Sequence, residues 1–462
     1  MTLLSAAAAI ALLAFLAVRA RRNPLFLAGA AAFLALGRSA FIDIVPDQVL
    51  SGVSGFSVMT GDVLFAAVAL GWLYARRRRR APRVRLSARW AGLGLGVLLF
   101  LGLELALTLA GLGGFHPLSV LGARDWFYIP LGYLLTLDIL RRFTADETAQ
   151  YVGVLSLFTT CLMVLYIAAA FGASVYPYPK YLTTSFGGVT IIRDFTTLPI
   201  WLGLAWGYYL SRSHKNGWTF AALAVLAGGA MLTYTRSLVL ILATSAGLAI
   251  VLLIARRGQR GRALVVGAAS AALAVAVLVG GPVLAPAQYG YLTARFGSAG
   301  GAGGALTQGS LNFRIGNFQE ARVAGSLVDP VFGAGLFGAS VGTSRSYDSY
   351  DSDWIRIVYR TAWAGVVVFA APLILALWWG VRGFLTQGTS STTGSLLLTA
   401  VLATAFFAIG RFTTITYFWW PALSLFSVAL IAYAAGRPVA GAAAASGPVD
   451  PGDEPARLAS GL

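Results

Sequence analysis

The stretch that decides the fold is residues 237–254, SLVLILATSAGLAIVLLI, which carries no charge between Arg236 and Arg256. An uncharged apolar run of about twenty residues is long enough to cross a bilayer as a helix. Its apolar positions are consecutive and do not alternate, which is typical of a membrane helix and not of a barrel strand. Comparable runs recur along the whole chain, so we expect a polytopic α-helical membrane protein.

The composition favours the same class. Of the 462 residues, 58% are hydrophobic and only 11% are charged, which excludes an ordinary soluble domain. We predict an all-α transmembrane domain over residues 1–435, with about twelve or thirteen transmembrane helices. The predicted spans are 3–18, 24–41, 57–75, 90–112, 124–140, 150–171, 195–211, 218–234, 237–254, 263–284, 355–380, 393–410 and 413–435.

The basic residues predict the orientation of these spans. Arginine and lysine favour cytoplasmic loops, and the Arg76–Arg80 run, Arg141, Arg142 and residues 256–262 all fall on one predicted side. We assign that side to the cytoplasm. The net charge of +17 is then explained by topology and anionic lipid, so nucleic acid is not an expected partner. The tail, 436–462, has too few large apolar residues to fold and is predicted to be a disordered cytoplasmic segment.

One long segment interrupts the series of spans. Residues 285–354 are predicted to form a large extracytoplasmic loop before the last three spans. The Gly297–Gly309 stretch within it is mostly glycine, alanine and serine, which is typical of a flexible segment. The loop also gathers charged residues where it returns to the membrane, so the chemistry is expected there.

The basic residues on the predicted outer side are arginines with a single exception. They are Arg38, Arg124, Lys180, Arg193, Arg236, Arg295, Arg314, Arg322, Arg345, Arg356, Arg360 and Arg411. An arginine inside a membrane helix costs about 2.5 to 3.5 kcal/mol on insertion scales, and a pocket for an anion would explain that cost. For Arg38, Arg124 and Arg411, snorkelling to the interface is the alternative.

Glu104 is the carboxylate that lies deepest in an apolar run. We predict that it is a buried partner for one of these arginines, with proton transfer as the alternative role.

Short motifs follow one another in a fixed order over residues 180–370. They are Ile192–Pro199 (IRDFTTLP), Leu232–Ser237 (LTYTRS), Asn312–Arg314 (NFR) leading to Asp329–Gly335 (DPVFGAG), and Asp351–Arg356 (DSDWIR) followed by Gly365. Together they resemble the O-antigen ligase and O-antigen polymerase superfamily, whose spans surround one large external loop. Ligases of that superfamily carry a histidine where Asp351 stands here, and an aspartate there is more similar to the repeat-unit polymerases.

The resemblance implies a GT-C-like glycosyltransferase in the bacterial plasma membrane with its active site on the extracytoplasmic side. It implies an inverting, metal-independent transfer of an undecaprenyl-pyrophosphate-linked glycan onto a glycan acceptor, which polymerises repeat units into a polysaccharide of the cell envelope. The catalytic base is expected to be Asp351, with Asp353 second. The residues expected to bind the pyrophosphate are Arg193, Arg236, Arg314, Arg356 and Arg360.

Partners and alternatives follow from the same interpretation. The expected partners are the lipid-linked donor, the glycan acceptor and the lipid bilayer, with a flippase or a chain-length regulator as a further candidate, and no cofactor is expected. Ligase-type transfer of a finished glycan, and transport of lipid-linked sugars by a flippase, are the alternative functions. Asp351 and Asp353 also have the spacing of a divalent-cation site. Gly333–Gly338 has the spacing of a dinucleotide fingerprint, but no βαβ pattern surrounds it, so we expect a turn-rich loop.

Overall fold

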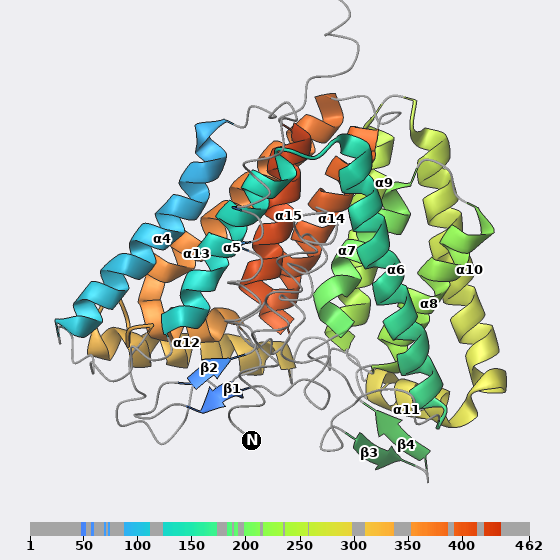
Figure 1. Cartoon of the computed structure of the whole chain (residues 1–462). Coiled ribbons are helices and arrows are strands. Elements are labelled where there is room, and N and C mark those ends of the chain that lie inside the picture. Colours follow the sequence, from blue (N-terminus) through green and yellow to red (C-terminus); the bar gives the residue numbers. More distant parts are fainter. Residues whose placement is uncertain are drawn as a thin grey trace, which may run out of the picture.

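The structure is a computed structural model. It describes residues 48–51, 57–59, 69–70, 73, 87–110, 123–172, 183–186, 189–192, 198–212, 216–233, 236–256, 258–297, 310–336, 353–386, 392–413 and 420–435. The predicted spans 3–18 and 24–41 and the tail 436–462 lie outside these residues. The described chain is a bundle of helices with two short two-stranded hairpins beside one end (Figure 1).

The structure confirms a helix at each predicted span from 90–112 to 413–435. These helices are α4 (Ala88–Leu109), α5 (Ala123–Leu140), α6 (Ala145–Ala170), α7 (Leu198–Ser211), α8 (Gly217–Leu232), α9 (Arg236–Ala255), α10 (Arg260–Leu284), α13 (Asp353–Thr386), α14 (Thr392–Thr413) and α15 (Trp420–Ala435). Six of the described helices are long and apolar enough to cross a membrane. The chain is therefore a polytopic α-helical membrane protein.

Two helix boundaries show where local chemistry overrides hydropathy. Helix α6 starts at Ala145, ahead of the predicted residue 150, because Thr144 and Glu147 form a capping box: Glu147 N–H donates to Thr144 Oγ1 at 3.1 Å and Thr144 N–H donates to Glu147 Oε2 at 2.8 Å. The predicted span 57–75 is wrong at its start, since Ser57–Met59 forms strand β2, which pairs with β1 (Gln48–Ser51). A second hairpin pairs β3 (Thr183–Phe186) with β4 (Val189–Ile192).

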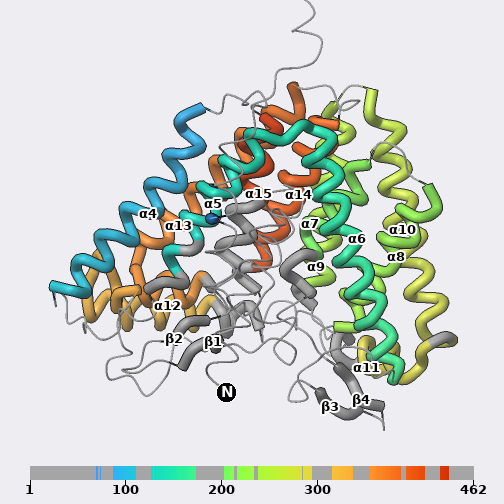
Figure 2. Tube along the Cα trace, viewed as in Figure 1, coloured from blue at the N-terminus to red at the C-terminus, as the bar shows by residue number. Residues whose placement is uncertain are grey.

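The predicted loop 285–354 contains two helices that hydropathy did not predict. They are α11 (Pro286–Gly297) and α12 (Ser310–Val328). On α12 the buried positions are Asn317, Ala321 and Gly325, spaced four apart, while most of their neighbours are exposed. This periodicity gives α12 one face of small side chains, and α12 contacts α13. In Figure 1, α12 lies crosswise at the end of the bundle where α11 and both hairpins also lie, and the tube in Figure 2 shows the same crosswise course of α12.

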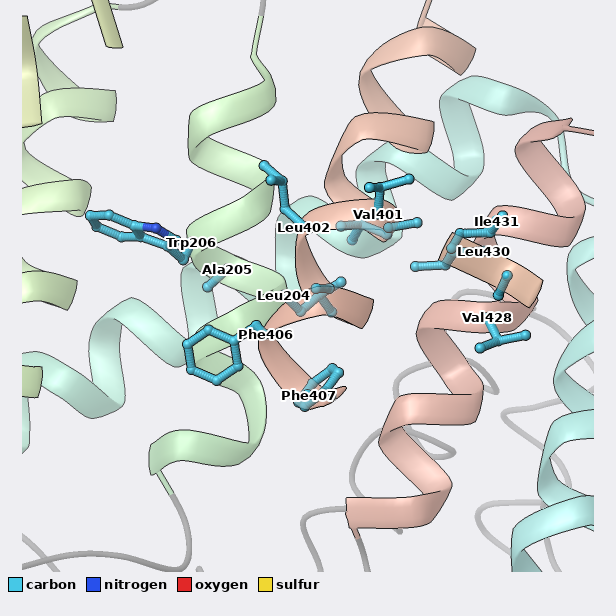
Figure 3. Packing of buried hydrophobic residues seen from close by; sticks show 14 of the residues in the cluster. Leu204, Ala205, Trp206, Val401, Leu402, Phe406, Phe407, Val428, Leu430 and Ile431 are labelled. Carbon is cyan, nitrogen blue, oxygen red and sulfur yellow. The ribbon is translucent and has the colours of Figure 1, made fainter. Parts of the chain in front are cut away.

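Helix α14 is the centre of the bundle. In its apolar membrane-spanning segment 78% of the residues are buried, against 11% in that of α10 at the periphery. Helix α14 contacts α7, α9, α13 and α15. Phe406 of α14 lies against Gly203 of α7, where an added Cβ would lie 2.5 Å from its ring, and Ile431 of α15 lies on the other side of α14 (Figure 3). Gly207 of α7 permits a close approach, since a Cβ there would lie 2.9 Å from the carbonyl oxygen of Thr399. Small residues at contacts of this kind are the usual way in which membrane helices pack closely.

The other end of the bundle gathers the basic helix termini. Arg256 Nη1 donates to the carbonyl of Phe384 at 2.8 Å, and Arg262 Nη2 donates to the carbonyl of Ser211 at 2.6 Å. These bonds bring the α9–α10 turn together with the last turns of α7 and α13. Arg256 and Arg262, which the sequence assigned to one side, therefore lie together at one end of the bundle, opposite α12. The side of the membrane that this end faces stays a prediction.

Candidate functional site

The DPVFGAG motif forms a tight turn that follows α12. The Asp329 carboxylate accepts the N–H groups of Val331 and Phe332 through Oδ1, each at 2.8 Å. The Gly333 N–H donates to the carbonyl of Asp329 at 2.9 Å. Gly333 and Gly335 have φ values of +65° and +81°, in the left-handed region that favours glycine. The segment is therefore held by its own Asp329 carboxylate and backbone groups, and the expected turn is confirmed over the described residues 333–336.

This turn docks on a kink in α13. Ala362 departs from helical geometry, with φ 45° and ψ −143°. Near the kink, the carbonyl of Tyr359 accepts the N–H of Ala334 at 3.0 Å. A Cβ on Gly333 would lie 2.6 Å from the Tyr359 carbonyl oxygen and 2.8 Å from the nitrogen of Ala362. The turn thus contacts the α13 backbone so closely that only a glycine fits at position 333.

Two arginines of α13 are buried, and one of them contacts this turn. Arg356 and Arg360 lie one helical turn apart on α13 and are 9% and 8% exposed. Arg360 Nη1 donates to the carbonyl of Gly335 at 3.4 Å. Arg356 lies in the first turn of α13, where the aligned peptide dipoles add positive potential. Since buried cations are costly to desolvate, this concentration of positive charge matches an anionic group.

A carboxyl group holds the opposite side of the turn. Glu104 of α4 is fully buried, and its Oε2 accepts the N–H of Leu336 at 3.4 Å. Its Oε1 has no hydrogen-bond partner among the described residues. Gly335 and Leu336 share one peptide group, so Arg360 binds the C=O and Glu104 binds the N–H of the same group. The sequence predicted a direct contact between Glu104 and an arginine. In the structure, the Gly335–Leu336 peptide group lies between Glu104 and Arg360.

An apolar groove adjoins the cluster. It has a volume of about 310 Å³ and is partly open to the surroundings. Its lining includes Phe318 of α12 and Trp354, Trp363 and Val366 of α13, and every lining side chain is apolar. Phe318 and Val366 also pack against the small cluster around Tyr359. The groove therefore lies next to the small cluster through which Ala334 of the turn packs on α13, and its apolar lining suits a hydrocarbon chain.

The structure brings together two of the predicted site residues, Arg356 and Arg360. Arg193 and Asp351 lie outside the described residues. The backbones of Arg236, Arg314 and Asp353 are described and their side chains are not: Arg236 and Asp353 are the first residues of α9 and α13, and Arg314 lies in α12. Helix direction puts these backbones at the α12 end of the bundle, opposite the basic termini (Figure 1).

No family model and no curated protein sequence matches this chain. The feature that a functional proposal must explain is the pair of buried guanidinium groups on a helix that also lines an apolar groove.

Proposed function

We propose that the protein is an integral-membrane glycosyltransferase that polymerises lipid-diphosphate-linked oligosaccharide repeat units into a surface polysaccharide. The observation that supports this most is the buried pair Arg356 and Arg360 on α13, the helix that also supplies most of the lining of an apolar groove. The planar guanidinium forms paired hydrogen bonds to phosphate oxygens, and the groove offers apolar contact to a long hydrocarbon chain. A polyprenyl diphosphate has both parts. The resemblance of the motifs over 180–370 to the O-antigen ligase and polymerase superfamily supports the same substrate class.

In the proposed reaction, a hydroxyl oxygen of the acceptor sugar attacks the anomeric carbon of the donor glycan. The bond between that carbon and the diphosphate oxygen breaks, and its electron pair leaves with undecaprenyl diphosphate. The arginines stabilise the negative charge that develops on the leaving group. The hydroxyl proton passes to a carboxylate, for which we propose Asp351, with Asp353 as the alternative. Attack from the face opposite the leaving group inverts the configuration of the anomeric carbon.

The remaining proposed diphosphate ligands are Arg193, Arg236 and Arg314. Each belongs to one of the quoted motifs, and the described backbones of Arg236 and Arg314 lie at the same end of the bundle as Arg356. We propose that this end faces the extracytoplasmic side of the bacterial plasma membrane. The aspartate at position 351 is the feature that favours a polymerase over a ligase.

Binding of undecaprenyl diphosphate by the purified protein in nanodiscs tests the proposal. Arg360→Ala removes a charged donor, and bonds to charged groups contribute about 1.5 to 3 kcal/mol, so the dissociation constant should rise about 10- to 100-fold. Arg322→Ala, an exposed arginine on α12, is the matched control and should bind like the wild type. Equal affinity for the wild type and Arg360→Ala would exclude this arginine from the diphosphate site.

The groove has a separate test in the same assay. Ala370 lines it, and Ala370→Trp would fill it. This variant should weaken binding of undecaprenyl diphosphate while binding of a short-chain, water-soluble prenyl diphosphate is unchanged. Equal weakening of both ligands would show that the substitution disturbs the diphosphate site and that the groove does not hold the chain.

A further inference from the structure

We infer that Glu104 is a positioning residue: its carboxyl group fixes the Gly335–Leu336 peptide group, and that peptide group orients the guanidinium of Arg360. The inference deepens the proposed function, and its activity measurements rest on that function. Its structural measurement, the exchange of one backbone amide, does not.

The geometry places one peptide group between the two side chains. The Leu336 N–H donates to Glu104 Oε2 and the Gly335 carbonyl accepts from Arg360 Nη1, each at 3.4 Å. Both distances are long for hydrogen bonds. Both contacts are nevertheless aligned with the dipole of the peptide group, because its positive N–H end faces the carboxyl oxygen and its negative C=O end faces the guanidinium.

The burial of Glu104 needs a physical reason. It lies on the inward face of α4 with Phe100, Leu101 and Thr108, and it is fully buried. A buried polar group costs free energy unless it is hydrogen-bonded, and leucine at this position would continue the apolar face. The hydrogen bond that the structure gives the carboxyl is the one from Leu336. The carboxyl group at position 104 is therefore explained by the hydrogen bond that it accepts from the Leu336 N–H of the turn.

The turn does not need Glu104 in order to fold. Asp329 caps it locally, and its Ala334 N–H is bonded to Tyr359 of α13. What Glu104 adds is a tie to α4, an element 232 residues away in sequence. Without that tie the Gly335–Leu336 peptide group can rotate, and one acceptor of Arg360 changes direction. The expected defect is thus in the placement of Arg360 and not in overall stability.

Hydrogen exchange at the Leu336 amide, followed by mass spectrometry of overlapping peptides, tests the tie directly. Glu104→Leu removes the acceptor, and Glu104→Asp withdraws the carboxyl by one methylene group. Both should speed exchange at Leu336 about tenfold or more, as expected for losing a bond to a carboxyl group. Glu104→Gln keeps a carbonyl acceptor of the same length and should preserve protection. The control Thr108→Val, one turn along α4, should also preserve it.

The readouts separate the competing outcomes. Glu104→Asp keeps the exchange test available even where Glu104→Leu fails to fold, and unchanged exchange at Leu336 in Glu104→Asp would overturn the inference. Binding of undecaprenyl diphosphate should weaken in Glu104→Asp and be retained in Glu104→Gln. Normal Leu336 protection with lost glycan transfer in Glu104→Gln would identify Glu104 as a proton acceptor and overturn the positioning role. Failure of every variant and the wild type to bind the lipid would refute the proposed function and leave the exchange result standing.

Discussion

Replacing Gly333 by alanine should destabilise the protein through two costs, backbone strain and steric overlap. The loss of stability should exceed either cost alone. The residue has a φ of +65°, and the left-handed region costs an alanine about 1 to 2 kcal/mol. The added Cβ would also lie 2.6 Å from the Tyr359 carbonyl oxygen and 2.8 Å from the nitrogen of Ala362. Those atoms belong to the backbone of α13 and cannot rotate away. Overlap of this kind typically costs about 1 to 3 kcal/mol, so we expect a total of about 2 to 5 kcal/mol.

Three other glycines separate the two contributions. Gly172 has a φ of +98°, and a Cβ added there would have nothing within 4 Å, so Gly172→Ala measures the backbone cost alone. Gly325 is helical, and its Cβ would overlap the Tyr359 carbonyl, so Gly325→Ala compared with Gly316→Ala measures the overlap. Gly316 in α12 has open space and ordinary helical geometry, so Gly316→Ala should be neutral or stabilising.

The assay unfolds the purified protein in detergent by heat and by denaturant. The unfolding midpoints of the wild type and of all four alanine variants are measured. Gly333→Ala should have the lowest midpoint, and Gly316→Ala should match or exceed the wild type. A Gly333→Ala protein as stable as Gly172→Ala would refute the close approach between the turn and α13.

Other predictions concern strain and chemistry. Ala362→Gly should raise stability by about 1 kcal/mol, because glycine adopts the positive φ of 45° without strain; a lower unfolding midpoint would contradict the kink. Arg236→Lys should lose transfer nearly as fully as Arg236→Ala, since lysine lacks the planar fork, while Arg295→Ala is tolerated; normal polymer length in the lysine variant would limit Arg236 to charge or packing. Asp351→Asn should keep donor binding and lose about 10² to 10⁴ in transfer rate; full activity there with an inactive Asp353→Asn would move the base to Asp353. Transfer should survive EDTA, and activity lost to EDTA and restored by magnesium would assign a metal to these carboxylates.

The helices could be predicted from hydropathy because membrane spans require long apolar runs. The predicted span 237–254 differs from α9 by one residue at each end. Helix α12 could not be found in this way. Its most buried described positions are Asn317, Ala321 and Gly325, which contribute little hydropathy. Its signal is a spacing of four between small residues, which becomes informative only when the facing helix is known.

The site was partly predictable for a related reason. Glu104 could be singled out because it is an isolated carboxylate in an apolar run. Arg356 and Arg360 could be singled out because arginine near a membrane is costly, and both are buried in the protein. The partner of Glu104 had no sequence signal, since Leu336 offers a backbone N–H and lies 232 residues away. The kink at Ala362 was also unpredictable, because alanine ordinarily favours a regular helix and the contact of Gly333 with Ala362 is a tertiary one.

Product analysis with purified protein tests the central claim most directly. The protein in nanodiscs would be supplied with undecaprenyl-diphosphate-linked oligosaccharide from its source cell, and glycan length and free undecaprenyl diphosphate would be measured together. The proposed mechanism predicts a ladder of glycans that grows by one repeat unit per step, with one undecaprenyl diphosphate released for each bond formed and no ladder with Arg360→Ala. Movement of the donor across the membrane without new glycosidic bonds or released undecaprenyl diphosphate would contradict it.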